Sequence, residues 1–121
     1  MIGIFSKTTD SNIVESAGYS GLDFIILDME HGPSSWEVIH DHVRASKVAG
    51  IDSIIRVKSN NPTEISKALD SGASGIQVPN IKSANQAKNV IKAAKFHPNG
   101  DRGVCRFVSA AGYGSIPKEE Y

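Results

Sequence analysis

Residues 22–33 read LDFIILDMEHGP, a nearly unbroken apolar run that becomes polar at Asp28. Such a run is typical of a parallel strand that is buried on both faces. The polar residues then follow the end of the strand, where parallel β/α folds carry their binding and catalytic side chains. Asp28–Pro33 is therefore predicted to be an active-site loop.

Three more short apolar runs share this character, and a helical segment follows each of the four. The predicted strands are residues 2–5, 22–27, 53–57 and 75–78. Strands that alternate with helices at this spacing favour a parallel sheet with right-handed crossover connections.

Each predicted helix has a recognisable start signal. The signals are Asp10 or Ser11, Ser34 with Glu37, Asn61 with Pro62 and Glu64, and Ser83 with Gln86. The last of these helices carries its apolar residues at Ala84, Ala87, Ile91 and Ala94.

Two parallel architectures compete, a doubly wound sheet and a closed barrel. A nucleotide-binding doubly wound sheet needs a glycine-rich turn after its first strand, and residues 5–9, FSKTT, contain no glycine. A closed barrel needs eight β/α units and about 250 residues. The prediction is an α/β fold, the first four units of a TIM-type (β/α)8 barrel, as one domain over residues 1–121. The tail from Pro98 to Tyr121 shows no clear fifth strand.

Composition narrows the possible partners and compartment. The 13 basic and 13 acidic side chains cancel, so nothing favours nucleic acid or an anionic membrane as a partner. Cys105 is the only cysteine, which excludes an internal disulfide and fits a reducing compartment. The apolar run at residues 2–5 is too short for a signal peptide. We therefore expect a cytoplasmic protein.

Polar side chains at the predicted strand ends could form one site. Asp28, Glu30 and His31 follow the second strand, and Arg56 lies in the third. Such a set can exchange protons and bind a carboxylate substrate. Simpler roles stay open: His31 could brace the loop, and Asp28 could cap it. Asp28 and Glu30 could be metal ligands, but two carboxylates do not complete the coordination shell of a cation.

Other reactive side chains are given structural interpretations. His40 and His42 are expected on the solvated side of the second helix, and Trp36 is expected to anchor the core. Cys105 has no activating neighbour in the sequence, so a nucleophilic role is not favoured.

Four blocks together resemble the HpcH/HpaI aldolase family. They are GLDFIILDMEHGP at 21–33, Arg56-Val57, ALDSGASGIQVP at 68–79 and HPNGDRGV at 97–104. The family comprises metal-dependent class II pyruvate aldolases, such as the 2-keto-3-deoxy sugar acid aldolases. The resemblance implies a β/α barrel in a homo-oligomer. It also implies a lyase that reversibly cleaves a 2-keto-4-hydroxy acid into pyruvate and an aldehyde.

The resemblance also implies roles for individual residues. His31 matches the base that removes the 4-hydroxyl proton, and Arg56 matches the arginine that binds pyruvate and stabilises its enolate. Asp70 matches the aspartate that raises the basicity of the histidine. Asp70 is expected at the opposite end of the barrel from the His31 of its own subunit. It would therefore act on the His31 of a neighbouring subunit. Within one subunit, Asp28 is the second candidate partner.

The family's divalent cation, Mg, Mn or Co, has ligands that the resemblance places outside this chain. They are a glutamate on the fifth strand and an aspartate after the sixth, both expected after Tyr121. Glu119 and Glu120 are not expected to replace them, because they precede that fifth strand. The leading hypothesis is therefore the N-terminal half of a pyruvate aldolase that needs the other half of its barrel. One alternative is a catalytically silent, self-associating half-barrel. Another is a related phosphoenolpyruvate or carboxylate ester lyase.

Overall fold

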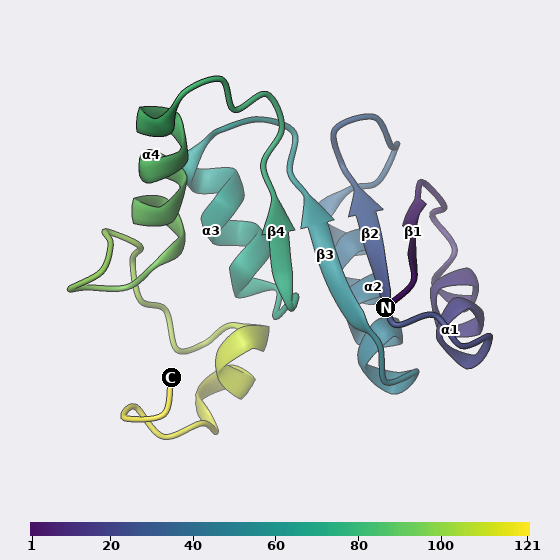
Figure 1. Cartoon of the computed structure of the whole chain (residues 1–121). Coiled ribbons are helices and arrows are strands. Elements are labelled where there is room, and N and C mark those ends of the chain that lie inside the picture. The colour runs from purple at the N-terminus through teal and green to yellow at the C-terminus, as the bar shows by residue number, and fades with distance from the viewer.

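A single sheet of four parallel strands, each followed by a helix, makes up most of the chain (Figure 1). The computed structural model describes all 121 residues. The strands are β1 Gly3–Ser6, β2 Phe24–Asp28, β3 Asp52–Arg56 and β4 Gly75–Gln77. The helices are α1 Ser11–Tyr19, α2 Trp36–Val48, α3 Pro62–Asp70, α4 Ala84–Ala94 and a 3-10 helix, η1 Ser109–Gly114.

The strands lie side by side in chain order, β1-β2-β3-β4. A doubly wound sheet would reverse this order at a switch point, and no reversal occurs here. The predicted half-barrel of four β/α units is therefore confirmed. No fifth strand follows α4, as expected, and none of the helices is long and apolar enough to cross a membrane.

The hydrophobic core lies between the sheet and the helices. Leu27 and Ile55 point from β2 and β3 towards Ile39 and Val43 of α2, and all four side chains are buried. In Figure 1, α2 lies behind β2 and β3, and no helix crosses in front of the sheet. One face of the sheet is therefore uncovered.

The uncovered face is built of residues that lie side by side in the sheet. Phe5, Ile26 and Ile54 occupy facing positions on β1, β2 and β3. Two residues beyond Ile26 and Ile54, towards the carboxyl ends of the strands, Asp28 faces Arg56. This face is therefore apolar in its middle and charged at the end where the loops converge.

Three of the four helix start signals hold. The side chains of Asp10, Asn61 and Ser83 accept hydrogen bonds from backbone N–H groups in the first turns of α1, α3 and α4. The second prediction is wrong by one residue, since α2 is capped by Ser35, whose hydroxyl accepts from the Val38 N–H. Ser34 is buried instead. The loop after β2 extends one residue further than the sequence pattern indicates.

The acid predicted to complete the cap of α3 does not do so. Asn61 accepts from the N–H groups of both Thr63 and Glu64, while the Asn61 N–H donates to the Ser59 carbonyl. The backbone therefore already satisfies the donor that a capping glutamate would take.

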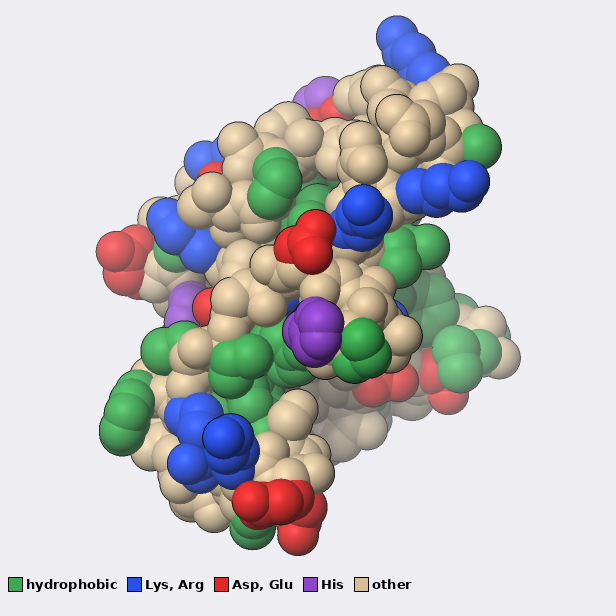
Figure 2. All heavy atoms as spheres, turned by 90° about the vertical axis from the view of Figure 1, so that its left-hand side faces the viewer, with side chains coloured by type: hydrophobic (Ala, Val, Ile, Leu, Met, Phe, Trp, Pro, Cys, Tyr) green, Lys and Arg blue, Asp and Glu red, His purple; other side chains and the backbone are tan.

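The apolar side of α4 is exposed. None of the residues of α4 is buried, and Ile91 is 56% exposed. The reason is position, because α4 follows β4, the last strand of the sheet, and has no helix beyond it. Figure 2 faces this side of the molecule and shows apolar side chains between basic and acidic ones.

The prediction for His42 is also wrong. His42 is buried, because α2 packs against α1 and turns this side chain towards the interior. Burial lowers the pKa of His42, and the backbone of Thr9 partly opposes that shift. Trp36 packs against the core as expected, and Cys105 is exposed.

Candidate active site

The loop after β2 is fixed by its own first residue. The Asp28 carboxylate oxygen Oδ1 accepts hydrogen bonds from the backbone N–H groups of Glu30, at 3.0 Å, and His31, at 3.1 Å. A Cβ atom at Gly32 would overlap the Asp28 carbonyl oxygen, so the loop needs glycine there. Asp28 therefore caps the loop, as one reading of the sequence proposed, and presents His31 at its tip.

The same carboxylate binds Arg56 from the neighbouring strand. Arg56 Nε lies 3.0 Å from Oδ1, and Nη2 lies 2.7 Å from Oδ2. The Asp28 side chain is fully buried and that of Arg56 is 19% exposed. The hydrogen bond from Arg56 lowers the pKa of Asp28 to about 2 although burial acts in the opposite direction, and the same bond raises the pKa of Arg56.

A second carboxylate joins the cluster from the loop. Glu30 Oε2 lies 3.2 Å from Arg56 Nη1 and 3.7 Å from His31 Nε2. Its other oxygen, Oε1, accepts a hydrogen bond from Asn80 Nδ2 at 3.3 Å. Glu30 thus contacts the residues at the ends of β3 and β4 as well as its own loop.

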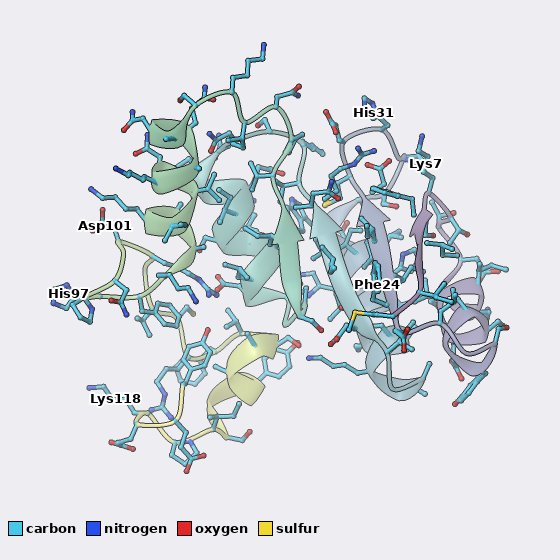
Figure 3. All side chains as sticks on the ribbon, in the orientation of Figure 1. Lys7, Phe24, His31, His97, Asp101 and Lys118 are labelled. Atoms are coloured by element: carbon cyan, nitrogen blue, oxygen red, sulfur yellow. The ribbon has the colours of Figure 1, made fainter.

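Two residues near the end of β1 complete the surroundings of Arg56. The guanidinium lies 4.8 Å from the centre of the Phe5 ring, within the range of a cation–π contact. Lys7 Nζ lies 3.9 Å from Asp28 Oδ2. Figure 3 shows Lys7 and His31 at the same end of the sheet.

This geometry leaves part of Arg56 available. Only its Nε and Nη2 atoms donate hydrogen bonds, both to Asp28. Nη1 faces Glu30 as an ion pair and keeps N–H donors for another anion. The site therefore combines a fixed cation with an exposed imidazole, an arrangement that can bind a carboxylate and move a proton next to it.

Asp70 is not part of this cluster. It is the last residue of α3, which returns the chain to the amino ends of the strands, away from His31. Its carboxylate is 2.6 Å from Arg102 Nη2, and the Arg102 guanidinium lies 4.6 Å from the centre of the Phe96 ring. The structure thus brings together Asp28, His31 and Arg56, and leaves Asp70 at the opposite end of the sheet.

Sequence reasoning assigned no role to Lys7, Phe5 or Asn80. The strand pattern contains a signal for Phe5, because alternation along β1 puts it on the face that carries Ile26. No local signal predicts the contact of Asn80, since its partner Glu30 is 50 residues away.

The side chains of this chain do not fit a divalent cation. Both Asp28 oxygens are hydrogen-bonded to Arg56, and both Glu30 oxygens contact cationic or amide groups. No three His, Cys, Asp or Glu side chains are grouped so that they could hold a metal ion.

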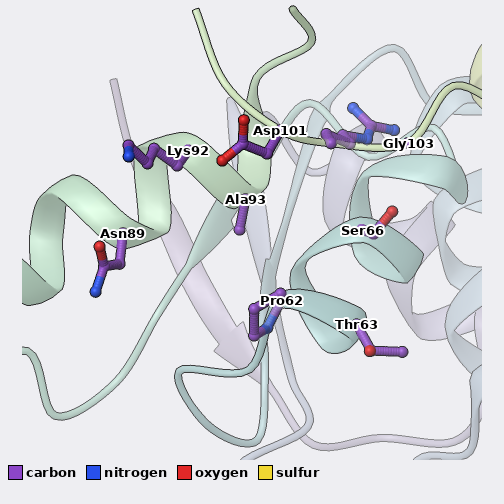
Figure 4. A pocket seen from close by; sticks show the side chains of 9 residues that line it. Pro62, Thr63, Ser66, Asn89, Lys92, Ala93, Asp101 and Gly103 are labelled. Carbon is purple, nitrogen blue, oxygen red and sulfur yellow. The ribbon is translucent and has the colours of Figure 1, made fainter.

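A separate pocket of about 490 Å³ lies between α3 and α4 (Figure 4). Its lining includes Pro62 and Ser66 of α3 and Lys92 and Ala93 of α4. Neither His31 nor Arg56 lines it. This pocket is therefore distinct from the cluster at the strand ends.

The sequence of this chain matches a known protein family. The model of the HpcH/HpaI aldolase/citrate lyase family matches residues 1–116. A 2-dehydro-3,6-dideoxy-6-sulfogluconate aldolase from Pseudomonas putida is 32% identical over 114 residues, which are 94% of this chain and 45% of that protein. A hydroxypyruvate/pyruvate aldolase from Roseobacter denitrificans is 34% identical over 117 residues, 96% of this chain and 46% of that protein.

A solved structure has the same arrangement of elements. It is an HpcH/HpaI aldolase/citrate lyase family protein from Burkholderia cenocepacia, with a TM-score of 0.89 and 27% sequence identity. The match covers 95% of this chain and 47% of the other. This chain thus spans about half the length of the relatives that it matches.

Proposed function

The chain belongs to the HpcH/HpaI aldolase/citrate lyase family, and from that premise we propose that it supplies the proton-transfer and anion-binding residues of a pyruvate aldolase. The reaction is the reversible cleavage of a 2-keto-3-deoxy acid, with a hydroxyl group at C4, into pyruvate and an aldehyde. The proposal rests on one observation, that the exposed His31 imidazole and the fixed guanidinium of Arg56 both contact the Glu30 carboxylate.

In this proposal His31 removes the proton of the C4 hydroxyl group. The C3–C4 bond breaks, the C4 oxygen becomes the aldehyde oxygen, and the electron pair of the bond passes into the enolate of pyruvate. Protonation of the enolate carbon then yields pyruvate. An imidazole suits the first step because histidine is the side chain that most often accepts a proton in general base catalysis.

Arg56 stabilises the negative charge that develops on the pyruvate fragment. Its Nη1 group forms no hydrogen bond and pairs only with the Glu30 carboxylate, at 3.2 Å, while Asp28 holds Nε and Nη2. A donor whose orientation is fixed before the reaction stabilises developing charge without reorganisation. Asp28 is thus a positioning residue in this proposal. Asp70 could act only on the His31 of a neighbouring subunit.

The divalent cation implied by the family, Mg, Mn or Co, does not fit the side chains of this chain. Its ligands would have to come from a further segment, and the steps above involve only residues of this chain.

The test is pyruvate formation from a 2-keto-3-deoxy acid by this chain extended with the remaining β/α units, with magnesium, manganese or cobalt added. We expect metal-dependent pyruvate release that falls at least 100-fold in His31→Ala. Arg56→Lys should also be strongly impaired, because lysine lacks the planar fork that Asp28 holds. Arg44→Lys, at an exposed arginine of α2, is the matched control. A folded extended protein without metal-dependent pyruvate formation would overturn the proposal, and would favour a related phosphoenolpyruvate or carboxylate ester lyase.

A second proposal concerns assembly, and its support is the uncovered face of the sheet. Phe5 is 51% exposed there, and β1 and β4 have free edges. Free strand edges favour pairing with another chain. We propose that further β/α units cover these edges, supplied by a complementary half-barrel or by a second copy of this chain. Light scattering of the purified chain tests the second copy, since a folded monomer at micromolar concentration contradicts it.

A further inference from the structure

The loop histidine has a single charged neighbour within ion-pair distance. The His31 side chain is 63% exposed, and Glu30 is the only acidic group near it. Asp28 engages Arg56 and contacts His31 only through the backbone N–H. Glu30 is therefore the one acidic side chain placed to influence the imidazole, at a distance of 3.7 Å from Nε2.

Both carboxylate oxygens of Glu30 have partners of their own. Its side chain is only 15% exposed, and a carboxylate at such a position needs partners to offset the cost of burial. Arg56 Nη1 and His31 Nε2 share Oε2, and Asn80 donates to Oε1. One carboxylate thus connects the base of the proposed reaction to its anion-binding group.

Asn80 adopts an uncommon backbone conformation to make its contact. Its φ angle is +60°, in the left-handed region that few residues other than glycine, asparagine and aspartate occupy. It follows Pro79, and proline followed by asparagine suits a turn with positive φ at the second position. This turn after β4 brings the amide back to the loop after β2.

We propose that Glu30 is a positioning residue that holds the His31 imidazole beside Arg56, and that Asn80 fixes Glu30 in this orientation. The role in catalysis rests on the proposed aldolase function, whereas the positioning does not. The other charged groups that face this cluster are Asp28 and Lys7, and neither forms a hydrogen bond or an ion pair with the imidazole.

The first test uses imidazole NMR signals of the 121-residue chain and needs no activity. We expect Glu30→Gln to shift the His31 signals, and Asn80→Gly to shift them in the same direction by less, because glycine keeps the positive φ and removes only the amide. Glu37→Gln, at an exposed acid of α2, is the matched control and should leave His31 unchanged. An unchanged buried His42 signal shows that each variant is folded. His31 signals that do not respond to Glu30→Gln would overturn the proposal.

The second test measures kcat in the extended enzyme by a double-mutant cycle. If Glu30 acts through His31, Glu30→Gln lowers kcat about tenfold in the otherwise unchanged enzyme and less than about twofold in the His31→Ala background. Equal losses in both backgrounds would overturn the positioning role. If the extended enzyme forms no pyruvate at all, the proposed function fails while the NMR result still decides the role of Glu30.

Discussion

Arg56 and Asp28 meet in two parallel contacts, Nε to Oδ1 at 3.0 Å and Nη2 to Oδ2 at 2.7 Å. The two residues face each other in the ladder between β3 and β2, so the sheet itself sets their approach. Asp28 Oδ1 also accepts two backbone N–H groups of the loop. One buried carboxylate thus fixes both a guanidinium and the loop that carries His31.

Removal of this charge should destabilise the protein. We expect Asp28→Asn to lower the free energy of unfolding by about 2–3 kcal/mol, because Arg56 loses its bidentate partner in a largely buried position. Urea unfolding followed by circular dichroism measures the change. The matched control is Asp41→Asn, at an exposed acid that pairs with Arg44 and should cost much less than Asp28→Asn because solvent screens the pair. Equal costs at the two sites would contradict the prediction.

Acid should remove the contribution of Asp28. Its pKa is lowered from 3.8 to about 2 in the folded chain, so the unfolded chain binds the proton more readily between these values. The stability that this carboxylate provides is present above about pH 4 and is lost as the pH falls towards 2. The lost contribution is on the order of 2 kcal/mol. Urea unfolding from pH 6 to pH 2 should show a smaller decrease for Asp28→Asn than for the unchanged chain.

Buried His42 should make stability depend on pH in a higher range. Burial lowers its pKa below the ordinary value of 6.5, so the unfolded chain binds a proton before the folded chain does. Stability should therefore fall as the pH decreases from 7 through that value. His42→Gln should reduce this dependence, whereas His97→Gln, at an exposed histidine, should preserve it. Unfolding curves at pH 7, 6 and 5 measure the effect, and identical slopes for both variants would refute it.

The loop should not tolerate a side chain at Gly32. A Cβ there would overlap the backbone carbonyl of Asp28, so Gly32→Ala must displace the segment that carries His31. We expect a loss of about 1–3 kcal/mol in unfolding free energy and shifted His31 NMR signals. Gly103→Ala is the matched control, because no atom lies within 4 Å of a Cβ at that position. A Gly32→Ala variant with unchanged His31 signals would contradict this account of the loop.

Local patterns were sufficient for the elements and for part of the site. The apolar run before Asp28 predicted a strand, and side-chain caps such as Asn61 predicted a helix start, because both depend on neighbouring residues along the chain. The position of Asp28 and Arg56 at strand ends was equally predictable, since parallel strands bring their carboxyl ends to one edge.

Tertiary structure decided what local patterns could not. His42 is buried because another helix packs on it, and the apolar side of α4 is exposed because β4 is an edge strand. Glu30 reaches Asn80 across 50 residues of chain. Such contacts depend on where whole elements pack, which no short stretch of sequence encodes. By itself, then, the sequence determined the β/α order and the polar strand ends, and only the folded sheet decided that Asp28 holds Arg56 and that Glu30 lies between Arg56 and His31.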